Sequence, residues 1–241
     1  MGKPLRAATL GDMQAFADSL AGTAPASQAR RLSVAKSLIS FGHRVGYLQF
    51  NIGAPVRAPK QKEALAERIL AESDVHRLLA LEQDPRNHAF LRLLYLAGLR
   101  ISEACALRWR DLQPRQDGGQ VTVFGKGGKT RVVLLPAASW GELAALRGEA
   151  GPDAPVFVSR SGGAAITAKA GHEIVKRAVV RAGLPDSISA HWLRHAHASH
   201  ALDRGAPISL VQQTLGHASV ATTGRYLHAR PNASSSQYLA A

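Results

Sequence analysis

At 241 residues, with 46% hydrophobic residues and a formal net charge of +13, the chain is long enough to bury a sizeable core and is strongly basic. It shows no signal-peptide pattern and no apolar run long enough to cross a membrane. Its single cysteine, Cys105, excludes an internal disulfide and a cage of several thiolates around a metal. These features predict a cytoplasmic protein that does not insert into a membrane.

The positive charge indicates a polyanionic partner, most simply nucleic acid, whose phosphates release counterions when lysine and arginine replace them. An arginine-rich composition also follows from a GC-rich genome, so charge alone leaves both explanations open. Aromatic residues make up only 5% of the chain. This low share disfavours a base-stacking platform for single strands.

The first 60 residues are the most basic part, with eight Lys/Arg and two Asp/Glu. Their hydrophobic spacing predicts helices over 10–20 and 27–45. The expected apolar faces are Met13, Phe16, Ala17 and Leu20 in the first helix, and Leu32, Ala35, Leu38, Ile39 and Phe41 in the second. Arg30, Arg31 and Lys36 are expected to point outward and to contact DNA. Two helices bury too little surface to fold well alone, so residues 1–54 read as a partial helical domain.

Residues 55–64 are expected to form a linker, because Pro55, Pro59 and a polar run interrupt helix formation. The remainder, 65–241, is predicted as one domain with helices over 73–81, 88–97, 101–107, 167–183 and 209–215, followed by further terminal helices. Residues 120–124 and 131–135 are β-branched runs around a glycine-rich loop, which predicts a hairpin, and 156–158 is a candidate third strand. The expected fold is therefore mainly α with a small antiparallel β-sheet (α+β).

Six residues carry the chemistry that this domain could perform: Arg100, Lys126, His191, Arg194, His217 and Tyr226. His191 and Arg194 lie three apart, on one helical face. Two guanidiniums can hold a phosphodiester and stabilise the extra charge of its transition state. A lysine on a flexible loop can protonate a leaving oxygen, and a tyrosine in a cationic setting can act as nucleophile. A phosphotyrosine product conserves the bond energy, so neither a metal nor another cofactor is predicted.

Each residue alone also has a structural interpretation. Arg100 could satisfy carbonyls at a helix end, Lys126 could be a solvated loop lysine, and Tyr226 could be a half-buried anchor. Glu103 is expected to pair with Arg100, one turn earlier, rather than to act as a base. Four histidines near one another in sequence, at 191, 195, 197 and 200, suggest a metal site, but the glutamate that a zinc protease needs inside such a histidine pair is absent.

The order and spacing of five motifs resemble the tyrosine recombinases, the phage-integrase and Xer-like family of site-specific DNA recombinases. These motifs are Gly98-Leu99-Arg100-Ile101-Ser102-Glu103, Gly125-Lys126-Gly127, His191-Trp192-Leu193-Arg194-His195, Leu215-Gly216-His217 and Tyr226. The resemblance covers about residues 65–230. It implies that Tyr226 attacks the scissile phosphate and forms a 3′-phosphotyrosyl link. It further implies that Arg100, His191, Arg194 and His217 bind and activate that phosphate, and that Lys126 protonates the leaving 5′ oxygen.

The resemblance also implies an assembly, namely a homotetramer on two DNA duplexes, with accessory DNA-bending proteins as further partners. Lys129 and Arg131, beside the loop lysine, are added as candidate DNA contacts. The chain departs from the family in having about sixty residues before the linker, where a four-helix domain of about a hundred is usual. Two alternatives to recombination therefore stay open: a DNA-binding remnant without productive recombination, and strand relaxation of the type IB topoisomerase kind.

Overall fold

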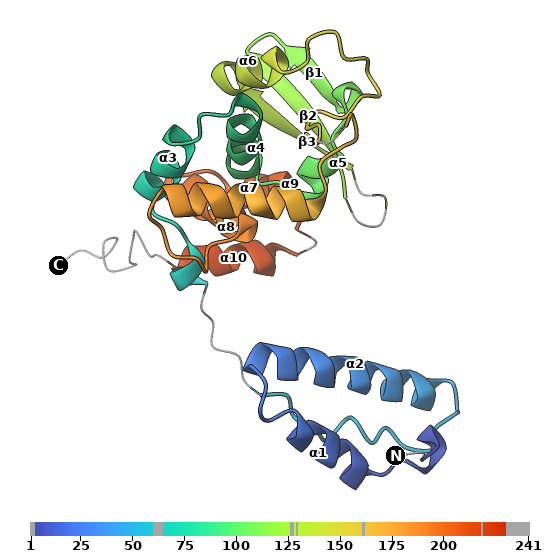
Figure 1. Ribbon diagram of the computed structural model, residues 1–241. Coiled ribbons are helices and arrows are strands. Elements are labelled where there is room, and N and C mark those ends of the chain that lie inside the picture. The colour runs from blue at the N-terminus through green and yellow to red at the C-terminus, as the bar shows by residue number, and fades with distance from the viewer. Residues whose placement is uncertain are drawn as a thin grey trace, which may run out of the picture. The chain divides into compact units, whose positions relative to one another are not determined.

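The computed structural model describes residues 3–59, 65–125, 128, 130–160, 162–217 and 219–229 (Figure 1). The chain separates into two compact units, Met1–Glu63 and Ala64–Ala241. Each unit has its own cluster of buried hydrophobic side chains, with Leu32 among the most buried in the first and Phe90 in the second. In the part of the chain that the structure describes, no helix is both long enough and apolar enough to span a bilayer.

The first unit consists of a short 3₁₀ turn, η1 (Leu5–Ala7), and two helices, α1 (Leu10–Ser19) and α2 (Pro25–Arg44). Thr9 starts α1 through a capping box: its hydroxyl accepts from the Asp12 backbone N–H, and the Asp12 carboxylate accepts from the Thr9 N–H at 2.7 Å. Pro25 starts α2, where its missing N–H costs nothing. Both helices were predicted, each within two residues of the observed bounds.

The apolar face predicted for α2 is only partly correct. Leu32 and Ile39 are buried against α1, but Leu38 and Phe41 are 56% and 57% exposed. At 100° per residue, Leu38 and Phe41 point away from the side that carries Leu32 and Ile39, so one helix face cannot bury all four. Phe16 of α1 is likewise exposed.

The predicted outward orientation of three basic residues on α2 holds for two of them. Arg30 and Arg31 are exposed. Lys36 is instead half-buried, and its Nζ donates to the backbone carbonyl of Val56 at 2.6 Å. This lysine therefore fastens the segment that follows the helix, and the expectation that it points outward is wrong.

The second unit is a helical domain with one small sheet. Its helices are α3 (Glu72–Ala80), α4 (Pro85–Leu96), α5 (Ile101–Ala106), α6 (Ala137–Ala145), α7 (Ala168–Arg181), α8 (Ala190–Asp203), α9 (Ile208–Leu215) and α10 (Val220–Ala229), with 3₁₀ turns η2 (Ala66–Arg68) and η3 (Trp109–Asp111). Helix α8 contacts α4, α9 and α10, whereas α6 packs on β2 at the sheet end of the unit (Figure 1). The predicted fold class, mainly α with a small antiparallel sheet, is confirmed.

The sheet has the order β1-β2-β3 and is antiparallel throughout, with β1 at Leu112–Arg115, β2 at Gly118–Phe124 and β3 at Thr130–Pro136. Val121 pairs with Leu112 on one side and Val133 on the other, and all three side chains enter the core. The hairpin of β2 and β3 was predicted, but β1 was not. Residues 156–158 are outside the sheet: Val158 makes only an isolated antiparallel bridge with Ala165. Val156 and Phe157 are buried, and the Phe157 ring meets Phe90 edge-on at 5.0 Å.

The start of one helix and the presence of another also differ from the prediction. Helix α4 begins at Pro85, three residues before the predicted start, because the Asp84 side chain caps it by accepting from the Asn87 N–H at 2.9 Å. Helix α6 was not predicted at all, since neither its N-cap residue, Pro136, nor its first turn gives a capping signal. Its Trp140 packs onto Gly119 of β2, where a Cβ would lie 2.0 Å from the indole.

Candidate active site

Arg100 is placed at the N-cap of α5 by the sharp turn at Gly98. Gly98 has a φ of +57°, and a Cβ there would lie 2.6 Å from Leu215 Cδ2 and 3.0 Å from His197 Cδ2. Glycine is therefore required both for the left-handed backbone and for the close approach of the neighbouring helices. The turn itself therefore lies against His197 of α8 and Leu215 of α9.

Replacing Gly98 by alanine should destabilise the second unit by about 3 kcal/mol, because a left-handed conformation costs about 1–2 kcal/mol and overpacking adds to it. Gly183→Ala is the matched control, since Gly183 has a φ of +63° but open space around the added Cβ. Its expected cost is the backbone contribution alone, about 1 kcal/mol. Urea unfolding measures both, and equal costs would show that the contact with Leu215 and His197 does not matter.

Glu103 joins two arginines in one buried network. Its carboxylate accepts from the Arg100 backbone N–H and from Arg100 Nη1, both at 2.8 Å, and from Arg131 Nη2 at 2.7 Å. Burial favours the protonated acid, but the hydrogen bonds from Arg131 and Arg100 outweigh it and lower the pKa of Glu103 to about 2. The predicted pairing of Glu103 with Arg100 is confirmed.

Arg131 was predicted as a DNA contact, but its side chain is only 9% exposed. Its guanidinium is engaged by Glu103, and its Nε donates to the Thr214 carbonyl at 2.7 Å. These contacts tie β3 to α5 and to the end of α9. They leave Arg131 poorly placed to reach a DNA backbone and well placed to hold Glu103.

Arg194 on α8 is buried, with 4% of its surface exposed. Its Nη1 donates to the Gly98 carbonyl, and its Nη2 donates to the Leu215 carbonyl at 2.6 Å. Burial and the neighbouring charge of Arg100 lower the pKa of Arg194 to about 10, so it stays protonated at neutral pH. A guanidinium has five N–H donors, so these two bonds can fix its plane while other donors serve an anion.

His217 follows Gly216, which ends α9 with a φ of +64°, as the sequence predicted. Its Nδ1 hydrogen-bonds Thr223 Oγ1 at 2.9 Å, and Thr223 is completely buried in α10. Burial, followed by the charges of Arg194 and Arg100, lowers the pKa of His217 to about 4. The imidazole is therefore neutral at physiological pH. Ser219 caps α10 as expected, accepting from the Ala221 N–H at 3.2 Å.

Tyr226 on α10 is 5% exposed and packs among Ile69 and side chains of α8 and α9. Its hydroxyl hydrogen-bonds His195 Nδ1 at 2.7 Å, and its ring stacks on His217 with centroids 6.4 Å apart and planes 6° apart. Burial raises the pKa of Tyr226, and the charges of Arg194 and Arg225 oppose that rise. The phenol therefore lies between two histidines, close to a buried arginine.

His191 lies one turn before His195 on α8, with ring centroids 6.1 Å apart. Ser189 occupies the N-cap of this helix, as predicted, although its side chain makes no capping hydrogen bond. Burial, then the charges of Arg194 and Arg100, lower the pKa of His191. Those same charges act on His217, so five of the six predicted residues share one electrostatic environment.

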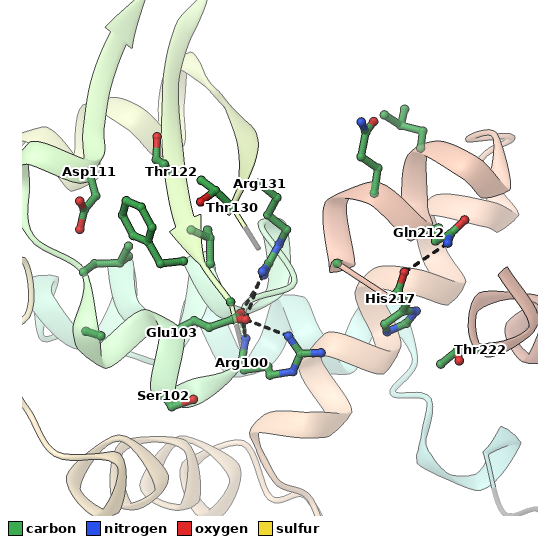
Figure 2. Close-up of a pocket in the computed structure, with 18 of the residues that line it drawn as sticks. Arg100, Ser102, Glu103, Asp111, Thr122, Thr130, Arg131, Gln212, His217 and Thr222 are labelled. Atoms are coloured by element: carbon green, nitrogen blue, oxygen red, sulfur yellow. Dashed lines mark hydrogen bonds and ion pairs between the residues drawn. The ribbon is translucent and has the colours of Figure 1, made fainter. Parts of the chain in front are cut away.

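A cavity of about 1310 Å³ is lined by Arg100 and His217, whereas His191 and Arg194 are not among its described lining residues. Figure 2 shows Arg100, Glu103 and Arg131 on its sheet side, with His217 and Thr222 facing them from the end of α9 and from α10. Among the described residues that line the cavity, Tyr226 does not occur. The Tyr226 ring lies parallel to the ring of His217, and His217 does line the cavity.

Two predicted residues, Lys126 and Lys129, lie outside the described residues. The histidines that suggested a metal have other partners: His200 Nδ1 bonds the Tyr95 hydroxyl at 2.9 Å, and its Nε2 bonds the Leu70 carbonyl at 3.0 Å. Within the described ranges, no group of three or more His, Cys, Asp or Glu could hold a metal ion.

Sequence reasoning missed three partners of the site residues: Arg131 for Glu103, Thr223 for His217 and His195 for Tyr226. The first joins positions 28 residues apart on different elements, and no periodicity reports such a contact. Thr223 lies on the same helix as Tyr226, three residues earlier, and this spacing is a usable signal. His195 was noted only for its spacing from His191.

A model described as the phage integrase family matches residues 67–233. The chain belongs to this family. Among curated members, the tyrosine recombinase XerC of Xanthomonas campestris pv. campestris (strain B100) is 39% identical over 213 residues, covering 86% of this chain and 65% of that protein. XerC of Xylella fastidiosa (strain M23) is 37% identical over 227 residues, covering 90% and 75%. The chain thus spans slightly less than two thirds of the first relative's length and three quarters of the second's.

Solved structures of other integrase-family proteins have the same fold. XerH recombinase bound to its difH substrate in a pre-cleavage complex has a TM-score of 0.74 at 23% identity, covering 92% of this chain and 68% of that one. XerA recombinase has a TM-score of 0.62 at 26% identity, covering 98% and 84%. A λ integrase dimer bound to a COC′ core site has a TM-score of 0.74 at 19% identity, covering 97% and 68%.

Proposed function

We propose that this chain is a site-specific DNA recombinase that cuts and rejoins DNA strands through a 3′-phosphotyrosyl intermediate. The observation that carries the proposal is the position of Tyr226, whose hydroxyl is 2.7 Å from His195 and whose ring stacks on His217. Membership of the phage integrase family and the recombinase names of the relatives support it. The XerH and λ integrase structures were solved with DNA, which supports double-stranded DNA as the substrate here.

The roles follow from charge and donor chemistry. Arg100 and Arg194 bind the non-bridging oxygens of the scissile phosphate and stabilise the charge that grows in its transition state. His191 and His217, neutral at physiological pH, donate hydrogen bonds to the same phosphate. Tyr226 attacks phosphorus, and Lys126 protonates the departing 5′ oxygen. Glu103 and Arg131 hold Arg100 in place and touch no reacting atom.

In the first unit we propose that the exposed Arg30 and Arg31 contact DNA. In the second unit we propose Lys129, close in sequence to Lys126, as a further DNA contact. Phosphate contacts of this kind contribute affinity that falls steeply with salt. We also propose that the enzyme acts in the cytoplasm as a homotetramer on two duplexes, with accessory DNA-bending proteins as further partners. These properties complete the recombinase hypothesis.

A plasmid with two directly repeated copies of the sequence flanking the gene tests the activity. A recombinase resolves this plasmid into two circles and leaves a plasmid without sites unchanged. Relaxation of both plasmids without resolution would instead favour the topoisomerase alternative, and binding without either reaction would favour a DNA-binding remnant.

Thr223→Val should slow covalent attachment to DNA about fivefold, because His217 loses the hydroxyl that orients its Nδ1, a loss worth about 1 kcal/mol. Thr223→Ser is the control, since serine keeps the hydroxyl and should keep most of the rate. The measurement is the initial rate of adduct formation on a nicked substrate. Equal rates for the valine and serine variants would contradict the positioning role of Thr223.

A further inference from the structure

Among the described residues, the Tyr226 hydroxyl is hydrogen-bonded to one histidine ring nitrogen, that of His195. His195 was not among the predicted catalytic residues. His195 Nδ1 lies 2.7 Å from that hydroxyl, a normal length for a hydrogen bond between a phenol and an imidazole. The two rings are tilted by 45° with centroids 5.7 Å apart, so the nitrogen points at the oxygen and the rings do not stack. His195 is held on α8 directly after Arg194, whose bonds to the Gly98 and Leu215 carbonyls fix that part of the helix.

The other histidines of the site are less suited to contact this hydroxyl. His217 lies parallel to the Tyr226 ring, so its nitrogens lie in a plane beside the phenol, and its Nδ1 is bonded to Thr223. His191 is one helical turn from His195 and contacts the His195 ring at a centroid distance of 6.1 Å. Contact with the nucleophilic oxygen therefore falls to His195.

We propose that His195 is a catalytic residue that accepts the phenolic proton of Tyr226 during strand cleavage. This inference rests on the proposed function and deepens it. The Tyr226 O–H bond breaks and its proton moves to His195 Nδ1, while the phenolate oxygen forms a bond to phosphorus. The bond from phosphorus to the 5′ oxygen breaks, and that oxygen takes a proton from Lys126. On rejoining, the 5′ hydroxyl attacks phosphorus and returns its proton to Lys126, the bond from phosphorus to the Tyr226 oxygen breaks, and His195 returns the proton to the departing phenolate.

Charges around His195 control when this transfer occurs. The imidazole is faced by His191 and Arg194 on α8, by Arg68 on η2, and by Arg225 beside Tyr226 on α10. Burial, then the interactions with His191 and with the three arginines, lower the pKa of His195 to about 4, while burial raises the pKa of Tyr226. Without DNA the phenol consequently keeps its proton. A phosphate bound at Arg194 brings negative charge beside His195, which favours the imidazolium and makes the nitrogen a stronger base.

The test compares wild type with His195→Gln and His195→Ala in single-turnover adduct formation on a nicked substrate, from pH 5.5 to 9. Glutamine retains a hydrogen-bonding side chain but cannot take up the proton. Both variants should therefore form the adduct about 10²–10⁴-fold more slowly than wild type. Both should bind the same DNA with unchanged affinity. Their rates should rise with pH up to the alkaline end, where hydroxide replaces the missing base, whereas the wild-type rate levels off.

Three outcomes separate the alternatives. A glutamine variant with the wild-type rate and pH profile would overturn the proposal and reduce His195 to a positioning residue. An alanine variant faster than wild type would overturn it too, showing that His195 restrains Tyr226. If wild type itself forms no adduct beyond that of Tyr226→Phe, the proposed function fails, independently of His195. Thermal unfolding of each variant identifies loss of fold, and the glutamine variant carries the test if alanine unfolds the domain.

Discussion

Tyr226→Phe should abolish covalent attachment to DNA while leaving DNA affinity within about threefold of wild type. The substitution removes one hydroxyl and keeps the ring, which packs with Leu215, Val211 and Ala198 in a buried cluster. The lost hydrogen bond to His195 costs about 1 kcal/mol of stability, too little to unfold the domain. The chemistry, in contrast, loses its only proposed nucleophile. The measurement is a denaturing gel of protein incubated with nicked DNA.

Tyr95→Phe is the matched control for this experiment. Tyr95 is also buried, and its hydroxyl also bonds a histidine Nδ1, that of His200, at 2.9 Å. Tyr95→Phe removes the same atom from the same kind of contact, with His200 in place of His195. Adduct formation should survive in Tyr95→Phe. Survival in Tyr226→Phe as well would mean that a different residue attacks the DNA.

Arg131→Met should lower the free energy of unfolding of the second unit by about 3 kcal/mol and its Tm by about 6–12 °C. The substitution keeps the aliphatic part of the side chain but leaves Glu103, whose side chain is 6% exposed, with Arg100 as its remaining side-chain partner. A buried carboxylate that loses a bidentate partner is costly, because burial penalises its charge. Urea unfolding followed by the signal of this unit provides the measurement.

The pH dependence of this loss has a definite sign. The pKa of Glu103 in the folded protein is about 2, below its ordinary value of 4.5, so ionised Glu103 stabilises the fold above about pH 4.5. That stabilisation is lost as the pH falls from about 4.5 toward 2. The difference between wild type and Arg131→Met should therefore be constant near neutral pH and shrink across this acidic window.

Arg77→Met provides the comparison on the surface. Arg77 pairs with Asp74 at 2.9 Å, but the two side chains are 50% and 32% exposed, so the expected loss is below about 1 kcal/mol. Equal losses for Arg77→Met and Arg131→Met would show that burial of the Glu103 network contributes nothing. A large effect at Arg131 alone supports its role as a structural residue and not a DNA contact.

Helix ends and the β-hairpin were predicted correctly, because each depends mainly on residues close together in the sequence. Gly98 and Gly216 were recognised as helix ends, and both adopt the left-handed conformation that glycine alone tolerates at low cost. The hairpin was predicted from two β-branched runs, and the motif residues Arg100, Arg194 and Tyr226 were identified from their order along the chain. The helix ends and the hairpin needed only a short window of sequence, whereas the motif residues needed the order of several motifs along the chain.

Features that depend on tertiary contacts were missed or misassigned. Leu38 and Phe41 satisfy a hydrophobic pattern, yet their exposure depends on which side of α2 faces α1. Arg131 is a basic residue next to a lysine-bearing loop, but a carboxylate 28 positions earlier determines its role. Strand β1, Leu-Gln-Pro-Arg, has no β-branched residue and exists because β2 pairs with it. Such pairings follow from the fold as a whole.

The most direct test of the central claim is to identify the amino acid that becomes linked to DNA. Wild-type protein would be incubated with a nicked substrate, digested with trypsin and nuclease, and the peptide–nucleotide adduct sequenced by mass spectrometry. We expect a 3′-linked nucleotide on the Tyr226 oxygen, in the peptide that follows Arg225. Attachment at another residue, or a nucleotide linked through its 5′ phosphate, would contradict it.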